Sequence, residues 1–243
     1  MIKNDIFGLS SQELAKRLGE NFRYNLASSA QENLGVDVLV LDMAGQGYTL
    51  KLGGRYVLVI PRSRNWFWQN FSVAHELGHV VNQHSFDVNS DDGGLSERQA
   101  NAFAAELLMP EADLRSLDWS DISANGLAEK VWELGVSTDA LKRRLKSLCI
   151  NPGEDIKYAL EQKTVSFLRG NLLSIGANEI AERSEASARR RVPASLITAL
   201  ESGVADGRVP PESLAYALDV PVSDLDLDLH EPDDFEQIFA GLE

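Results

Sequence analysis

The chain has 243 residues with a formal net charge of −14, and 44% of its residues are hydrophobic and 25% charged. This composition is typical of a folded globular protein with one large domain or two smaller ones, and the negative charge disfavours nonspecific binding to nucleic acid. The sequence has no apolar run of membrane-spanning length and no signal-peptide core near its N-terminus, so we expect a cytoplasmic protein without direct contact to membranes or nucleic acid.

The first predicted helix begins after Ser10 and runs to about Gln31. Ser10 and Glu13 have the spacing of a capping box, in which each residue satisfies a backbone N–H group of the other. Apolar residues then recur at helical spacing along the segment. We interpret it as a scaffold helix.

Three β-rich runs follow, at Val36–Leu41, Tyr48–Leu52 and Arg55–Ile60. The last two flank Gly53-Gly54, which is a two-residue hairpin signal. Together the runs predict a small antiparallel sheet of three strands packed on helices.

The next helix carries the sequence His-Glu-Leu-Gly-His at residues 75–79. On a helix, His75 and His79 lie within about 40° of each other, so both imidazoles project from one face. Two neutral imidazoles on one face can bind zinc, and the neighbouring carboxylate of Glu76 can take a proton from a water on the metal. The alternative is a chance pair of structural histidines.

A third metal ligand is not supplied by the metzincin pattern, which would need Gly at position 82 and His at position 85. The chain has Asn82 and Ser85 there, so we expect His84 to be a surface residue. We interpret the acidic segment 87–94 as an ordinary exposed connection.

A second helix is predicted at Glu97–Met109, with Ser96 as its N-cap. Glu97 lies on the flank of the apolar face, whereas Glu106 lies roughly opposite and should face solvent. If this helix packs on the helix that carries His75 and His79, it would present a metal ligand from this flank, which favours Glu97 as the third ligand. The alternative role for Glu97 is to complement the helix dipole.

The segments NFSVAHELGHVV and ERQANAFAAELLMP resemble the ImmA/IrrE family of zinc metallopeptidases, which inactivate phage and stress-response repressors by cleavage. The resemblance covers about residues 30–150 and implies a zincin-like fold of the α+β class. It also implies that His75, His79 and Glu97 bind Zn2+ and that Glu76 is the catalytic general base. Asn101 would then orient one of the ligands.

The resemblance does not cover the whole chain. Family members often carry an N-terminal helix-turn-helix domain, for which we find no room before the strands. We therefore divide the chain into a zincin-like metallopeptidase domain at 1–150 and a mostly helical C-terminal region with an acidic tail at 151–243.

These observations predict a zinc-dependent endopeptidase that cleaves a protein substrate, such as a transcriptional repressor or an antitoxin-like regulator. The substrate should bind extended along an edge of the sheet, and Tyr56 and His84 are both candidates for the oxyanion donor. One alternative is a non-proteolytic regulatory protein that sequesters a repressor through a zinc-stabilised scaffold. A second is a zinc-stabilised scaffold with no chemistry.

Overall fold

The computed structural model describes residues 6–52, 54–84 and 94–226. The acidic connection predicted at 87–94, apart from Gly94, and the acidic tail lie outside the described residues. None of the helices in the described ranges combines the length and apolar character that crossing a membrane would require. The chain divides into two compact units, Met1–Arg189 and Arg190–Glu243.

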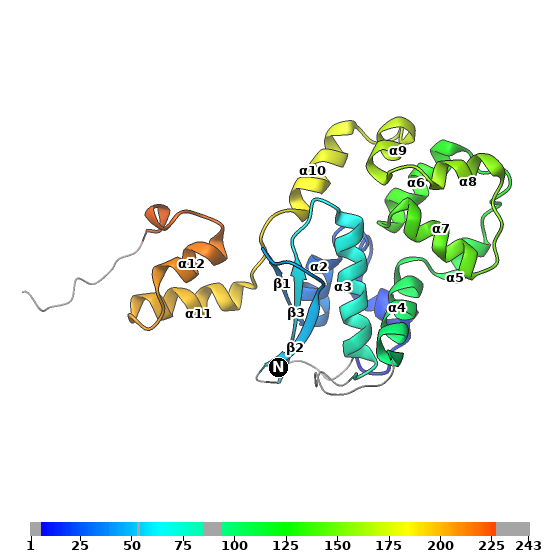
Figure 1. Ribbon diagram of the computed structural model, residues 1–243. Helices are drawn as coiled ribbons and strands as arrows, with labels where there is room; N and C mark the ends of the chain where they lie inside the picture. The colour runs from blue at the N-terminus through cyan, green and yellow to red at the C-terminus, as the bar shows by residue number, and fades with distance from the viewer. Residues whose placement is uncertain (1–5, 53, 85–93, 227–243) are drawn as a thin grey trace, which may run out of the picture. The chain divides into compact units, whose positions relative to one another are not determined.

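The first unit contains the sheet and most of the helices (Figure 1). Its strands are β1 (Asp37–Leu41), β2 (Tyr48–Leu52) and β3 (Arg55–Pro61). Its helices are α1 (Ser11–Leu18), α2 (Leu26–Ser29) with a π-helical continuation (Ala30–Leu34), α3 (Trp66–Val81), α4 (Leu95–Leu108), α5 (Glu111–Arg115), α6 (Ala124–Leu134), α7 (Thr138–Ser147), α8 (Glu154–Leu160), α9 (Thr164–Asn171) and α10 (Ala177–Ser187). The α+β class predicted from the sequence is confirmed.

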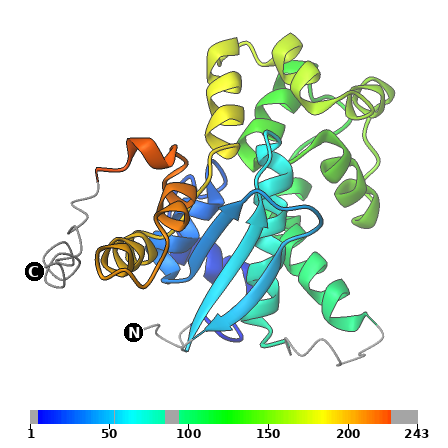
Figure 2. The same cartoon turned by 60° about the vertical axis from the view of Figure 1, so that its left-hand side comes forward.

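The sheet is mixed rather than wholly antiparallel, so the predicted strand meander is wrong (Figure 2). The strand order is β1-β3-β2, with β1 parallel and β2 antiparallel to β3. The most apolar strand takes the centre, because β3 is buried from Tyr56 to Pro61. By contrast β2 buries only Thr49, and it forms an edge of the sheet.

The helices α3 and α4 lie side by side, and α3 also packs on β2 and β3 (Figure 1). Their close approach depends on Gly78, whose backbone is so near α4 that an added Cβ would lie 3.0 Å from the Cα of Ala100. A larger residue at this position would push the two helices apart. Glycine in the middle of the motif therefore sets the distance between the two helices that carry the candidate site.

Two predicted helix boundaries are wrong. The first helix ends at Leu18 rather than at about Gln31, because Gly19 adopts a φ of 85° that a continuing helix does not allow. The capping box of Ser10 and Glu13 at its start is confirmed. The helix α4 begins at Leu95 with Gly94 in the left-handed N-cap position, so Ser96 lies inside the first turn instead of capping it.

The helices α8 and α9 pack on α6 and α7, and α10 packs on α3 and α9. The division predicted at residue 150 therefore falls inside the first compact unit. That the parts before and after residue 150 differ in function stays a prediction. Arg183 anchors α10 to this unit, since its side chain is buried among the aromatic rings of Tyr24, Trp66 and Trp132.

The second unit is described as far as residue 226 and contains α11 (Ala194–Ala205), α12 (Pro211–Leu218) and a short 3-10 turn (Val222–Asp224). The two helices pack through Val204, Leu214 and Ala215, which are buried. This unit agrees with the mostly helical C-terminal region that the sequence predicted.

Candidate active site

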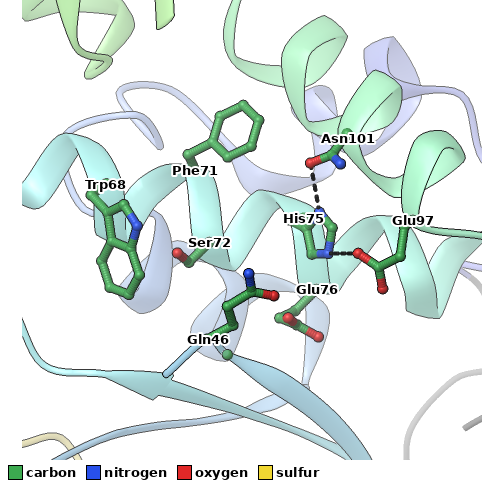
Figure 3. Close-up of a pocket in the computed structure, with 9 residues that line it drawn as sticks. Gln46, Trp68, Phe71, Ser72, His75, Glu76, Glu97 and Asn101 are labelled. Atoms are coloured by element: carbon green, nitrogen blue, oxygen red, sulfur yellow. Dashed lines mark hydrogen bonds and ion pairs between the residues drawn. The ribbon is translucent and has the colours of Figure 1, made fainter. Parts of the chain in front are cut away.

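Three side chains from α3 and α4 converge on one point. The Nε2 atoms of His75 and His79 lie 3.1 Å apart, and each lies 3.3 Å from a carboxylate oxygen of Glu97. Figure 3 shows His75 and Glu97 facing each other across the gap between the two helices. Within the described ranges, these three residues form a group whose ligand atoms could hold one metal ion.

The spacing of these atoms fits a tetrahedral zinc site. Zinc binds imidazole nitrogen and carboxylate oxygen at about 2.0–2.2 Å, which places two ligands of a tetrahedron about 3.3–3.5 Å apart. The observed separations of 3.1 and 3.3 Å are close to this range. The side chains of His75 and His79 are 17% and 12% exposed and that of Glu97 is 56% exposed, so one side of the triangle is open.

The second ring nitrogen of each of these two histidines also has a hydrogen-bonding partner. The Nδ1 atom of His75 lies 3.0 Å from Oδ1 of Asn101, an atom that can only accept a hydrogen bond. His75 therefore carries its proton on Nδ1 in the neutral form, and its Nε2 presents a lone pair to the centre. This is the orienting role that the family resemblance implies for Asn101.

A second chain of hydrogen bonds supports His79 and involves His84. The Nε2 atom of His84 lies 2.9 Å from Oε1 of Gln99, and this amide oxygen accepts a hydrogen bond from the Nε2–H group. Nδ1 of neutral His84 is then an acceptor, and Nδ1 of His79 donates to it over 3.0 Å. His84 is half-buried against His79, so its predicted place on the surface is wrong.

With both protons on Nδ1, the three converging atoms all present lone pairs. Three acceptors at this distance repel one another unless a cation lies between them. The described residues therefore fit a bound divalent metal in both spacing and charge.

Glu76 lies on the sheet side of α3, next to the edge strand. Its Oε2 accepts a hydrogen bond of 2.7 Å from the hydroxyl of Thr49, and the residue is only 5% exposed. Burial raises the pKa of Glu76 above its ordinary value, and the Thr49 hydrogen bond and nearby His75 partly oppose this shift. A raised pKa suits a carboxylate that takes up and releases a proton near neutral pH.

Gly47 gives this carboxylate its space. A Cβ at position 47 would lie 3.1 Å from the carbonyl oxygen of Val59 and 3.3 Å from Oε1 of Glu76. Any larger residue would press on the carboxylate and on the central strand. Gly47 therefore helps to shape the candidate site.

A pocket opens in front of these groups (Figure 3). It has a volume of about 200 Å³ and is lined by Gln46, Ser72, His75, Glu76, Glu97 and neighbouring residues of α3 and α4. Neither predicted oxyanion candidate lines it. Tyr56 is buried against Phe7, and His84 lies behind His79.

The structure brings together the four residues that the sequence predicted as metal ligands and general base, namely His75, Glu76, His79 and Glu97. Their roles as ligands and base stay predictions. Sequence reasoning missed Thr49, Gln99 and the contact of His84. No sequence signal pointed to Thr49, because its burial depends on how β2 packs, and nothing in the spacing connects Gln99 to His84.

A comparison with family models matches residues 31–146 to the peptidase family described as the IrrE N-terminal-like domain. Residues 31–146 are thus similar to the peptidase domain of the ImmA/IrrE family, which confirms the resemblance over this region. The match runs from the π-helical turn before β1 to the end of α7 and includes the whole candidate site. No curated protein matches the chain.

Proposed function

We propose that this protein is a zinc-dependent endopeptidase whose substrate is a protein of the repressor or antitoxin type. The observation that carries the proposal is the position of the buried Glu76 carboxylate, beside a triangle of three lone-pair donors and at the wall of an open pocket. Membership of a metallopeptidase family supports it. The repressor-like substrate rests on the family resemblance alone.

His75, His79 and Glu97 are the residues that would hold zinc. Two imidazoles and one carboxylate are a donor set that zinc favours in catalytic sites, where a fourth position stays open. When bound there, zinc polarises a carbonyl group and lowers the pKa of a water molecule to about 7.

Glu76 then handles the protons of the hydrolysis. Its carboxylate accepts a proton from the attacking water as the water oxygen bonds to the scissile carbonyl carbon. When the C–N bond breaks, the same proton passes to the leaving amine nitrogen. Thr49 holds the carboxylate by its Oε2, which leaves Oε1 for the reacting water.

The substrate would bind in an extended conformation along β2. This strand pairs with β3 on one side, and its other side is an edge of the three-stranded sheet. The pocket begins at Gln46 and Gly47, directly before this strand. A peptide that pairs with the free edge would bring its carbonyl groups past Glu76.

The test compares wild type with Glu76→Gln, a change that keeps the side-chain volume. Zinc content should remain the same, because Glu76 is not a ligand, while cleavage should fall by about 10²–10⁴-fold. A survey of new protein N-termini in cells that express either form would reveal the substrate. Termini that appear only with wild type support the proposal.

The same survey separates the alternatives. If a repressor is inactivated without new termini, the protein acts by sequestration. If Glu76→Gln leaves the function in cells unchanged and the loss of His79 unfolds the domain, the metal has only a structural role. Retained cleavage in Glu76→Gln would overturn the assignment of the base.

A further inference from the structure

A second cavity adjoins the candidate catalytic pocket. It has a volume of about 690 Å³ and shares Trp68, Phe71 and Asn101 with the smaller pocket. A volume of this size is within the range of about 300–1,000 Å³ that is typical of ligand-binding cavities. Because the two cavities share a wall, a peptide that reaches Glu76 also passes the mouth of the second cavity.

Most of the surface that lines this cavity is apolar, although polar side chains such as Asn65, Ser137 and Ser147 also contribute. Phe67, Trp68 and Phe71 come from α3, Ala105 from α4 and Ala140 from α7, and the buried Met109 follows α4. Trp68 is 37% exposed, and Figure 3 shows it and Phe71 projecting from α3 near the candidate site. Large exposed aromatic side chains at a cavity mouth gain free energy when an apolar group covers them.

The charged groups around the cavity are already paired. Arg144 forms an ion pair with Glu106 and donates to the carbonyl oxygen of Met109. Arg143 is 80% exposed and pairs with Asp139 at 2.9 Å. These pairs satisfy one another, so no buried charge in the cavity requires an oppositely charged ligand. The chemistry of the walls favours an apolar occupant.

We propose that this cavity is a specificity subsite that takes a bulky apolar side chain of the substrate, of the Leu, Met or Phe class. This inference rests on the proposed peptidase function and adds the substrate chemistry that the site selects. Because the two pockets share Trp68, Phe71 and Asn101, the selected residue lies close to the cleaved bond in the peptide. Ala105 and Ala140 set the volume by leaving two sides of the cavity without long side chains.

The first experiment measures binding without cleavage. Zinc-loaded full-length Glu76→Gln protein is used to select from a displayed library of random seven-residue peptides. A bulky apolar residue at one position should be enriched at least about tenfold over alanine, since a hydrophobic pocket discriminates by about this factor for each methylene group. Absence of such enrichment would overturn the subsite.

A substitution that fills the cavity tests whether the subsite lies there. Ala105→Phe, added to Glu76→Gln, should abolish the preference, whereas Ala102→Phe should retain it. Ala102 is an exposed residue of the same helix that lines neither pocket. Ala140→Phe fills the same cavity from α7 and replaces Ala105→Phe if circular dichroism shows that the latter does not fold. If a folded variant with a filled cavity still prefers a bulky apolar residue, the subsite proposal is overturned.

Cleavage by the wild type separates this inference from the proposed function. In a series of peptides that differ at the selected position, kcat/KM should fall at least about tenfold when the bulky residue becomes alanine. If the selection shows the preference and the wild type cleaves nothing, the peptidase proposal fails and the subsite stands. If the wild type cleaves all members of the series equally, the subsite fails and the peptidase proposal stands.

Discussion

Two polar clusters lie on different parts of the first unit, and they differ in how their polar atoms are used. At Arg183, which is 3% exposed, the guanidinium donates to the carbonyl oxygens of Arg23, Tyr24 and Trp132 at 2.7–3.2 Å. Burial lowers its pKa to about 10, still far above neutral, so the group keeps its charge. At His75, His79 and Glu97, acceptors instead face one another around an open centre.

The difference teaches how to separate structural from functional polar groups in this fold. The Arg183 cluster is closed, because each of its three nitrogens donates to a carbonyl oxygen and the charge lies against aromatic rings. The histidine cluster instead has the donor set and the spacing that could hold a cation. We therefore expect substitutions in the first to change stability and substitutions in the second to change metal binding and activity.

The largest effect is expected for Glu97→Ala. Zinc affinity and cleavage should both fall by at least about 10³-fold, because one of three ligands is lost. The free energy of unfolding without metal should change by less than about 0.5 kcal/mol, since the side chain is 56% exposed. Metal analysis and denaturation in a chelator measure the two quantities. Glu20→Ala, at another exposed glutamate, is the control, and full zinc content in Glu97→Ala would contradict the ligand assignment.

Arg183→Met should show the opposite pattern. Methionine keeps the apolar stem among the rings but removes all the donors, so the free energy of unfolding should fall by about 3 kcal/mol. Zinc affinity and the activity of the folded protein should stay within about twofold of wild type. Chemical denaturation measures the change against Arg169→Met, which alters an exposed arginine of α9. Equal stability of both variants would mean that the closed cluster does not hold α10.

A smaller effect is expected for His84→Phe, which keeps a ring but removes the acceptor for His79. Loss of a residue that orients a metal ligand should weaken zinc binding by about 10–100-fold. His84→Asn places an amide oxygen near the lost Nδ1 and should recover most of the affinity. A competitive zinc titration distinguishes the two. The proposed hydrogen-bond chain fails if both variants bind zinc equally well.

The smallest effect is expected for Thr49→Val, which removes the hydroxyl that donates to Glu76. The pKa of Glu76 should rise further, because this hydrogen bond lowers it. A smaller fraction of the base is then deprotonated below neutral pH, so the acidic limb of kcat/KM moves to higher pH. On the acidic limb, kcat/KM at a given pH should fall about tenfold, as expected for the loss of one hydrogen bond to a charged group. Thr49→Ser should keep the wild-type pH profile, and an unchanged profile in Thr49→Val would exclude this role.

The local parts of the fold followed from the sequence. Period and spacing along one helix were enough to put His75 and His79 on one face, because residues one turn apart on a helix are neighbours whatever the rest of the chain does. The flank position of Glu97 was also predicted, but its approach to the histidines requires α4 to pack on α3, which a local pattern does not fix. The capping box at Ser10 and the strand at Tyr48–Leu52 were predicted because their signals are local as well.

The tertiary structure decided what depends on residues far apart in sequence. The choice of β3 as the central strand, the contact of His84 with Gln99, and the burial of Arg183 each require two elements to meet. Many apolar faces compete for the same neighbours, and this competition determines which elements pack together. The periodicity of a single segment carries no information about the outcome. The sequence by itself therefore determined which residues could share a helix face. The fold decided how the sheet edge and the hydrogen-bonding partners are arranged around them.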